Sequence, residues 1–188
     1  MIRFAASLLL LFFFSLSVKA QTAAPPPPPP PPLTPEQNAW AADTAKPCYK
    51  DPDMPAFNIR LMDSSTIFNT FNIPEGKLFA VVFFDPNCKH CKRSIAQLLG
   101  AMETVDHIQF YFITPTHMMS DLRKFYSDNN MASYKNIVLA GRDYEFFFFN
   151  HYRTINVPDV ALYDKNKKIV KLIEGEFGPA EILKYMPK

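Results

Sequence analysis

The sequence predicts an α/β fold in which a mixed central β-sheet carries helices on both faces. Three observations predict it. Leu78 to Phe84 is an unbroken apolar run, which is typical of a strand buried on both faces. The segment that starts at Cys88 places its apolar residues at helical spacing. Beyond it, strand-like and helix-like segments alternate to the C-terminus, which favours a single layered domain.

Two short extended pieces precede the apolar run. Residues Phe57 to Met62 alternate apolar and polar side chains, and Phe68 to Ile73 form a second extended piece. The sequence Pro74 to Lys77 then has the composition of a turn. We therefore predict that Leu78 to Phe84 is the central strand and that two short strands come before it.

The segment from Cys88 to about Val105 is predicted to be a helix with one buried face. Its apolar residues recur three and four positions apart, as residues on one side of a helix do. They are Cys91, Ile95, Leu98, Leu99 and Met102. The helix is expected to begin at or beside Cys88, directly after the central strand.

The remaining elements continue the alternation. Strands are predicted at Ile108–Thr114, Asn136–Ala140, Val160–Tyr163 and Lys168–Ile173, and helices at Ser120–Asp128 and Pro179–Met186. A tight polar turn at residues 164–167 joins the last two strands as a hairpin. Phe146 to Phe149 are four consecutive aromatic residues. On a helix, two or three of them would lie in the core, and one would be exposed for partners or line a substrate groove.

Residues 1–20 have the three-part layout of a secretory signal peptide. Arg3 precedes an apolar stretch at residues 4–18, and Val18-Lys19-Ala20 follows at the expected cleavage site. An uncleaved N-terminal anchor is the alternative, because the stretch is shorter than the roughly 20 residues that cross a bilayer but flanking residues could extend it. Both interpretations place the domain outside the cytoplasm.

Residues 21–45 are predicted to be a Pro-rich disordered linker. Pro25 to Pro32 form an unbroken proline run, which favours an extended stalk of roughly 25 Å. A docking ligand for an aromatic groove on a partner is the alternative interpretation of the run. The folded domain is expected to span residues 46–188.

Composition and charge exclude disorder along the whole chain and argue against nucleic-acid binding. A chain that is 48% hydrophobic and 20% charged is not disordered throughout. Arg3 and Lys19 account for the formal net charge of +2, so the rest of the chain is neutral. A neutral surface lacks the clustered basic footprint that binds nucleic acid. No glycine-rich phosphate loop occurs, and the sequence indicates no cofactor.

The strongest chemical signal is Cys88-Lys89-His90-Cys91 at the start of the predicted helix. Two thiols three residues apart on a helix share one face at the separation that a disulfide needs. The helix N-terminus supplies positive potential, which favours a thiolate at Cys88, and Lys89 and His90 add to it. The motif indicates disulfide exchange. Stabilising the thiolate favours the reduced form of the pair and makes its disulfide a stronger oxidant. The Lys89-His90 dipeptide between the cysteines therefore points to an oxidant or isomerase.

A structural disulfide and a metal site are the alternatives at this motif. A zinc site would require a second pair of ligands, but His107, His117 and His151 show no paired spacing, and Cys48 is the one remaining cysteine. No metal is therefore expected. Three interpretations of Cys48 stay open, namely an intermolecular disulfide or reactive thiol, a buried or incidental thiol, and exchange with the CxxC pair.

The strand-CxxC-helix unit resembles the thioredoxin superfamily, as does the downstream segment at residues 152–164, in which Val157-Pro158 precedes a strand-turn-strand unit. Within it, the chain is most similar to exported TlpA/ResA-like thiol:disulfide oxidoreductases, which add strands before the thioredoxin core. The resemblance covers roughly residues 55–188 and implies a thioredoxin-like fold with an N-terminal strand extension.

The resemblance also implies roles for single residues. Cys88 matches the nucleophile that forms the mixed disulfide, and Cys91 matches the thiol that resolves it. Pro158 matches the cis-proline that lies against the CxxC motif and lets the backbone of Val157 pair with an extended substrate segment. With His90, these are the predicted site residues.

The chain departs from the family at several positions, some of which bear on proton transfer and substrate choice. Residues 79–84 contain no acid, whereas thioredoxin carries a buried carboxylate on this strand that assists the resolving thiol. Glu75, Glu103 and Asp159 are unranked candidates to replace it. Asp159 also stands where the family commonly has Thr, and Asn87 stands where it often has an aromatic residue.

The sequence thus predicts an enzyme, an extracytoplasmic thiol:disulfide oxidoreductase of the periplasm or cell envelope, with or without a membrane tether. Its expected partners are protein thiols and disulfides, together with a membrane or envelope electron donor or acceptor. We favour a reductase, because the resemblance covers the whole domain while His90 is one residue. A non-enzymatic thioredoxin-fold binding or scaffold module is the alternative function.

Overall fold

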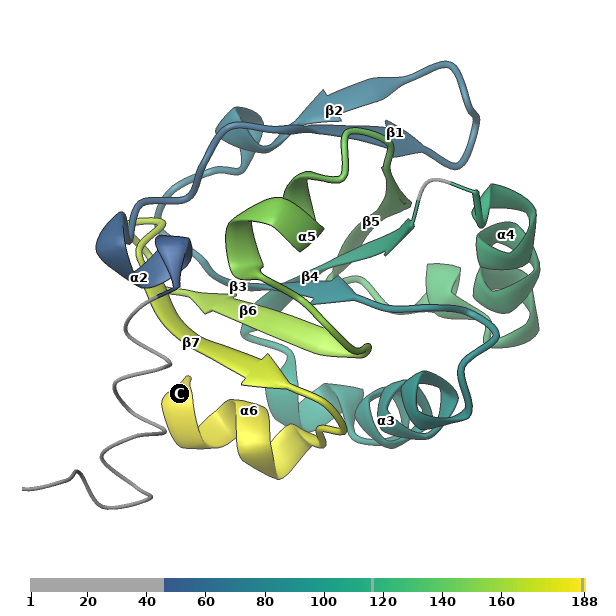
Figure 1. Cartoon of the computed structure of the whole chain (residues 1–188). Helices are drawn as coiled ribbons and strands as arrows, with labels where there is room; N and C mark the ends of the chain where they lie inside the picture. Colours follow the sequence, from purple (N-terminus) through teal and green to yellow (C-terminus); the bar gives the residue numbers. More distant parts are fainter. Residues whose placement is uncertain (1–45, 116, 187) are drawn as a thin grey trace, which may run out of the picture. The chain divides into compact units, whose positions relative to one another are not determined.

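The computed structural model describes residues 46–115, 117–186 and 188 (Figure 1). The predicted signal peptide at 1–20 and linker at 21–45 lie outside the described residues. Among the described helices, none combines the length and the apolar character that a membrane crossing requires.

A mixed sheet of seven strands runs through the described domain in the order β2-β1-β5-β4-β3-β6-β7. The strands are β1 (Asn58–Leu61), β2 (Ile67–Asn69), β3 (Leu78–Phe83), β4 (Ile108–Pro115), β5 (Ile137–Asp143), β6 (Asp159–Tyr163) and β7 (Ile169–Glu174). Strands β3, β4 and β5 run parallel, while β6 pairs antiparallel with β3 and β1 pairs antiparallel with β5. The predicted mixed sheet is confirmed.

Helices cover both faces of this sheet (Figure 1). The α-helices are α2 (Pro47–Lys50), α3 (Lys89–Gly100), α4 (Met119–Asp128), α5 (Phe147–Tyr152) and α6 (Pro179–Tyr185). The short 3₁₀ helices are η1 (Thr70–Asn72), η2 (Met102–Val105) and η3 (Met131–Ser133). Helices α3, α4 and α6 share one core, and α2 and α5 share the other.

The alternation of side chains along β3 builds these two cores. Ala80 and Val82 face α3, whereas Phe79, Val81 and Phe83 face α5. On the α5 side, Phe79 stacks on Tyr163 with ring centroids 4.8 Å apart. Because both faces of the strand are covered, every residue must be apolar, which explains the unbroken run in the sequence.

The strand predicted at Asn136–Ala140 extends to Asp143, and two other predicted elements end well before their predicted boundaries. The second strand ends at Asn69, not Ile73, because the Asn69 side chain accepts a hydrogen bond from the Phe71 amide at 2.9 Å and caps η1. The helix after the CxxC motif ends at Gly100, where low helical propensity favours termination. Ala101 has left the helical region (φ −122°, ψ 21°), so η2 is a separate turn.

The predicted N-terminal strand extension is present as the β1–β2 hairpin. Strand β1 approaches β5 so closely at Gly141 that a Cβ there would lie 2.5 Å from Ile59 Cγ2 and 2.7 Å from the Arg60 carbonyl oxygen. Only glycine therefore allows this pairing. The hairpin is also held to α4, since Arg123 Nε donates to the Met62 carbonyl at 2.7 Å.

Candidate active site

A tight turn after β3 delivers Cys88 to the N-terminus of α3. Asp85 Oδ1 accepts the Asn87 amide at 2.7 Å, and the Asp85 carbonyl accepts the Cys88 amide at 3.1 Å. Cys88 is the N-cap residue, and its carbonyl accepts the Lys92 amide at 3.0 Å. The helix therefore begins beside Cys88, as its sequence predicted.

The two thiols of the motif differ sharply in their surroundings. Cys88 is partly exposed, whereas Cys91 is completely buried against the α3-side core, and both are free thiols. Burial, together with hydrogen bonding to Cys88, raises the pKa of the Cys91 thiol to about 12. The pair thus has one residue that is partly exposed to solvent and one that is fully buried.

Val157 and Pro158 lie against the motif at the start of β6. The Val157–Pro158 peptide bond is cis, and the Val157 carbonyl accepts a hydrogen bond from Cys88 Sγ at 3.9 Å. The Pro158 carbonyl accepts the Gly175 amide at 2.8 Å. Segments far apart in sequence, after β3, before β6 and after β7, therefore meet at one end of the sheet (Figure 1).

A groove of about 560 Å³ opens at this meeting point. Its lining includes the reactive thiol, acidic residues, an imidazole and apolar side chains. The residues are Asp85, Cys88, His90, Ile155, Asn156, Val157, Gly175 and Glu176. Ile155 is 86% exposed at its rim, so an incoming polypeptide would meet an apolar side chain beside the thiol.

His90 lies in the groove, but its ring is engaged by an acid that the sequence analysis missed. His90 Nδ1 contacts Glu176 Oε1, and Arg93 Nη2 donates to the same oxygen at 3.0 Å. The hydrogen bond with His90, helped by the Arg93 charge, lowers the pKa of the Glu176 carboxyl. Glu176 is 86 residues from His90 in sequence, so no local spacing could have indicated this contact.

Comparison with known proteins agrees with this geometry. A family model described as a thioredoxin-like domain matches residues 72–188. The chain belongs to the thioredoxin-like domain family. No curated protein matches it. The predicted membership of the thioredoxin superfamily is therefore confirmed.

Solved structures of low sequence identity share the fold of this thioredoxin-like protein. StoA from Bacillus subtilis is 13% identical over 70% of this chain and 96% of its own, with a TM-score of 0.54. A thiol:disulfide interchange protein of the thioredoxin family from Chlorobium tepidum is 16% identical over 71% and 95%, with a TM-score of 0.57. A secreted Mycobacterium tuberculosis disulfide oxidoreductase homologous to E. coli DsbE is 15% identical over 65% and 85%, with a TM-score of 0.52. Two of these proteins are named as a thiol:disulfide interchange protein and a disulfide oxidoreductase, and what this chain shares with them is the fold.

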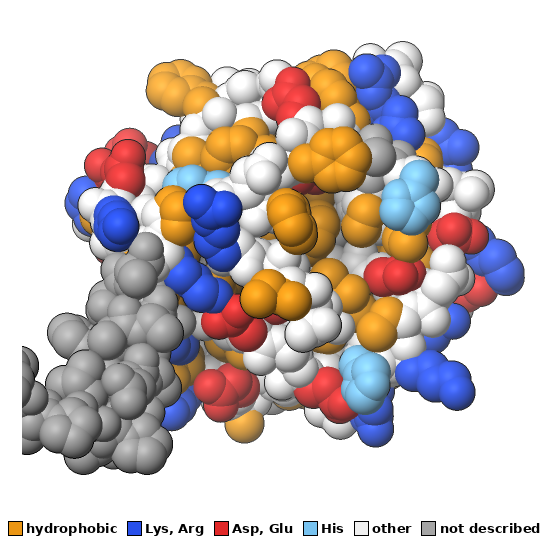
Figure 2. Space-filling view, in the orientation of Figure 1, with side chains coloured by type: hydrophobic (Ala, Val, Ile, Leu, Met, Phe, Trp, Pro, Cys, Tyr) orange, Lys and Arg blue, Asp and Glu red, His pale blue; other side chains and the backbone are white. Residues whose placement is uncertain are grey.

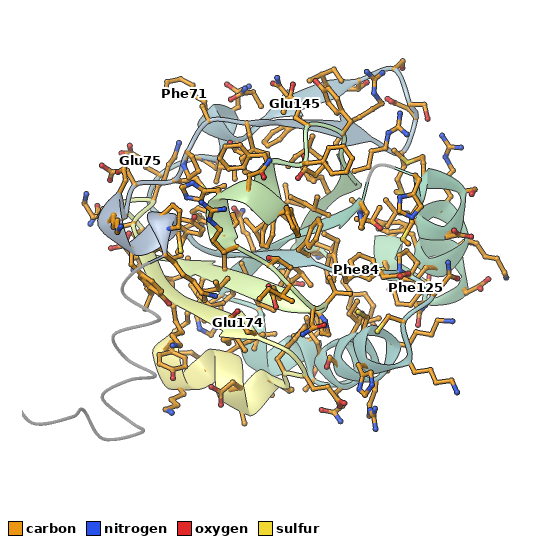
Figure 3. The ribbon with its side chains drawn as sticks, viewed as in Figure 1. Phe71, Glu75, Phe84, Phe125, Glu145 and Glu174 are labelled. Carbon is orange, nitrogen blue, oxygen red and sulfur yellow. The ribbon has the colours of Figure 1, made fainter. Side chains whose placement is uncertain are left out.

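In this thioredoxin-like domain, two of the three residues predicted to assist proton transfer at Cys91 lie far from the CxxC motif. Glu75 precedes β3, at the opposite end of that strand from Cys88, and Figure 3 shows it well apart from Phe84, which follows the strand. Glu103 lies in η2, beyond the far end of α3, a helix about 18 Å long. Neither side chain lines the groove.

Asp159 follows the cis-proline but occupies the other face of the sheet. Its β6 neighbours Val160 and Leu162 face the core that contains Cys91, so alternation places Asp159 on the α5 side. It is 1% exposed, its Oδ1 accepts the Gly175 amide at 3.4 Å, and burial raises its pKa to about 6. The acid beside the thiols is instead Asp85. Its position three residues before Cys88 in the sequence could have indicated this role.

Cys48 and the aromatic run lie mainly on the α5 face of the thioredoxin-like sheet. Cys48 is 1% exposed in the same core as Tyr152, across the sheet from Cys91, so it does not meet the CxxC pair in this arrangement. Phe148 is buried, and Phe147 stacks on Phe57 at 4.4 Å. Two aromatics are therefore inward and two, Phe146 and Phe149, are more than half exposed, one more than predicted.

The part of the chain that the structure describes contains no candidate metal site. Within the described residues, no three or more His, Cys, Asp or Glu side chains are arranged to hold a metal ion.

Hydrophobic side chains gather over α5 on the face shown in Figure 2. The core on the α3 side includes Phe84 and Phe125, whose rings lie 5.3 Å apart between β3 and α4 (Figure 3).

Proposed function

We propose that this protein is an extracytoplasmic thiol:disulfide oxidoreductase that exchanges two electrons with protein substrates through Cys88 and Cys91, and that it works as a reductase. One observation carries the proposal. A partly exposed thiol lines a groove at a helix N-terminus, and a fully buried thiol follows one turn later. This asymmetry suits a two-step exchange in which only the first sulfur meets the substrate.

The reaction balances within the dithiol. The Cys88 thiolate attacks a substrate disulfide, which forms a Cys88–substrate disulfide and releases one substrate thiolate. The Cys91 thiolate then attacks Cys88 Sγ, which forms the Cys88–Cys91 disulfide and releases the second substrate thiolate. Two electrons pass to the substrate, and a membrane or envelope donor must return them.

The resolving step requires Cys91 to lose its proton. Its pKa of about 12 depends partly on hydrogen bonding to, and charge on, Cys88, and both contributions end when Cys88 enters the mixed disulfide. Asp85 lies close enough for its charge to raise the same pKa, and it also lines the groove. We assign Asp85 as the acceptor of the Cys91 proton, directly or through one water.

The contacts of His90 support the reducing direction. A cation directed at Cys88 would stabilise its thiolate and make the disulfide more oxidising. Here the imidazole contacts Glu176, a carboxylate whose negative charge opposes the positive potential at Cys88. The leader-like residues 1–20, and the word 'secreted' in the name of one structural neighbour, support a location outside the cytoplasm.

Trapping of mixed disulfides tests the exchange. The full chain with Cys91→Ala should accumulate disulfide-linked complexes with envelope proteins, because no thiol remains to release them. The matched Cys88→Ala variant should form none. Equal recovery of partners with both variants, unaffected by reductant, would instead establish a binding module and overturn the enzymatic proposal.

The reduction potential of the Cys88–Cys91 pair in the purified protein tests the direction of electron transfer. Equilibration with glutathione should give a value near that of thioredoxin, about −270 mV, for a reductase. A value near about −120 mV would assign an oxidant and overturn the reducing direction while leaving the exchange intact.

A further inference from the structure

We propose that Glu176 is a positioning residue that holds the side chains of His90 and Arg93 and opposes the positive potential at Cys88, and so keeps the potential of the CxxC pair on the reducing side. The inference rests on the proposed function and deepens it, because it assigns the residue that sets the direction. It concerns a residue on the loop between β7 and α6, outside the CxxC motif.

Both oxygens of the Glu176 carboxylate contact basic side chains of α3. Oε1 contacts His90 Nδ1 and accepts from Arg93 Nη2 at 3.0 Å, and Oε2 pairs with Arg93 Nε at 3.0 Å. Arg93 Nη2 also lies 3.2 Å from His90 Nδ1. His90 and Arg93 both lie on the first turns of α3, so a single carboxylate contacts two of the basic side chains near the reactive end of that helix.

The loop that carries Glu176 is held in place from two sides. The preceding Gly175 donates its amide to the Pro158 carbonyl at 2.8 Å. The following Phe177 is buried and donates its amide to Ser94 Oγ on α3 at 3.1 Å. Gly175 has a positive φ of 86°, which favours glycine at this bend. The carboxylate is therefore presented to α3 by a fixed backbone.

The direction of the effect follows from charge. Cations near Cys88 stabilise its thiolate and hence the reduced pair, which makes the disulfide a stronger oxidant. A carboxylate in the same groove opposes that stabilisation and binds the imidazole to itself. The lowered pKa of Glu176 keeps the carboxylate charged at neutral pH. Because all three side chains are about half exposed, solvent screening keeps the effect modest.

The glutathione equilibrium of the folded protein measures this effect directly. In the reaction, the protein disulfide and two glutathione thiols give the protein dithiol and one glutathione disulfide. Glu176→Gln should raise the equilibrium constant roughly three- to tenfold at pH 7 and low salt, where tenfold corresponds to about 30 mV. The gain should shrink as salt is added.

Glu181→Gln is the matched control. It removes the same charge from the first turn of α6, and the Glu181 side chain forms no hydrogen bond or ion pair with any described residue. Its equilibrium constant should stay within about twofold of wild type. An equal shift in this variant would mean that net charge alone is responsible and would overturn the positioning role.

A His90→Gln background tests whether Glu176 acts through the imidazole. There, Glu176→Gln should lose at least half of its effect, because the interaction between the two residues is already gone. An unchanged effect in that background, or no shift in the wild-type background, overturns the inference while leaving exchange by Cys88 and Cys91 intact. Failure of the wild-type pair to exchange with glutathione would instead overturn the proposed function, and the inference with it.

Discussion

The resolving thiol poses the main chemical problem at the scale of single residues. Cys91 is fully buried, and its pKa of about 12 leaves almost no thiolate at neutral pH. Burial continues to oppose ionisation of Cys91 after Cys88 has entered the mixed disulfide, so release of product depends on a nearby base. In this chain the central strand offers no carboxylate, and Asp85, at the end of the strand, is the acid that the structure places beside the thiols.

Replacement of Asp85 by Asn should slow resolution of the mixed disulfide. The amide cannot accept the Cys91 proton, so the Cys88–substrate disulfide should persist roughly tenfold longer or more at pH 7. Rapid acid quench followed by mass spectrometry of the mixed disulfide measures its lifetime. Asp121→Asn, which changes an acid in the first turn of α4, is the control. Equal lifetimes in wild type and Asp85→Asn would show that solvent takes the proton.

At the scale of secondary-structure elements, the β1–β2 hairpin depends on one close backbone approach. Gly141→Ala would place a methyl group 2.7 Å from the Arg60 carbonyl oxygen, which is backbone and cannot rotate away. We expect a loss of about 1–3 kcal/mol in unfolding free energy, together with faster hydrogen exchange of the Ile59 and Arg60 amides.

Gly100→Ala is the matched control for this prediction. A Cβ at Gly100 would meet nothing within 4 Å, and the residue is exposed at the end of α3. Its stability should be unchanged or slightly higher, since Ala has the greater helical propensity. If Gly141→Ala were as stable as Gly100→Ala, the hairpin would not need the close approach.

The sequence predicted elements with strong patterns and missed details set by single contacts. The apolar run of β3 and the helical spacing after Cys88 are local signals, and both elements begin where expected, although the helix ends early, at Gly100. The end of β2 depends on a side-chain cap by Asn69, which hydrophobic periodicity does not register. Glu176 lies 86 residues from His90 in sequence, so the contact between them exists only once the chain has folded.

At the scale of the whole molecule, the sheet separates the thiols from a second buried titratable group. Asp159 is 1% exposed on the face opposite Cys91, and burial raises its pKa to about 6 from an ordinary value near 3.8. A carboxyl whose pKa is raised by folding binds its proton more tightly in the native state. Its contribution to stability is therefore largest below about pH 4 and is lost as pH rises through 6.

Asp159→Asn should remove this pH dependence. Above pH 7 the variant should be more stable than wild type by about 2–3 kcal/mol, because no charge is then buried, whereas near pH 4 the two should be nearly equal. Urea unfolding at pH 4 and pH 8 gives the comparison. A stability difference that is the same at both pH values would show that Asp159 does not titrate between them.

The depth of Cys91 also bears on how the protein survives oxidative damage. A peroxide or an alkylating reagent reaches only Cys88, since its partner has no accessible surface. If peroxide converts Cys88 to a sulfenic acid, the Cys91 thiol one turn away can condense with it, giving the disulfide and one water. That product is the ordinary oxidised form of the pair, so the electron donor that serves catalysis would also repair the lesion.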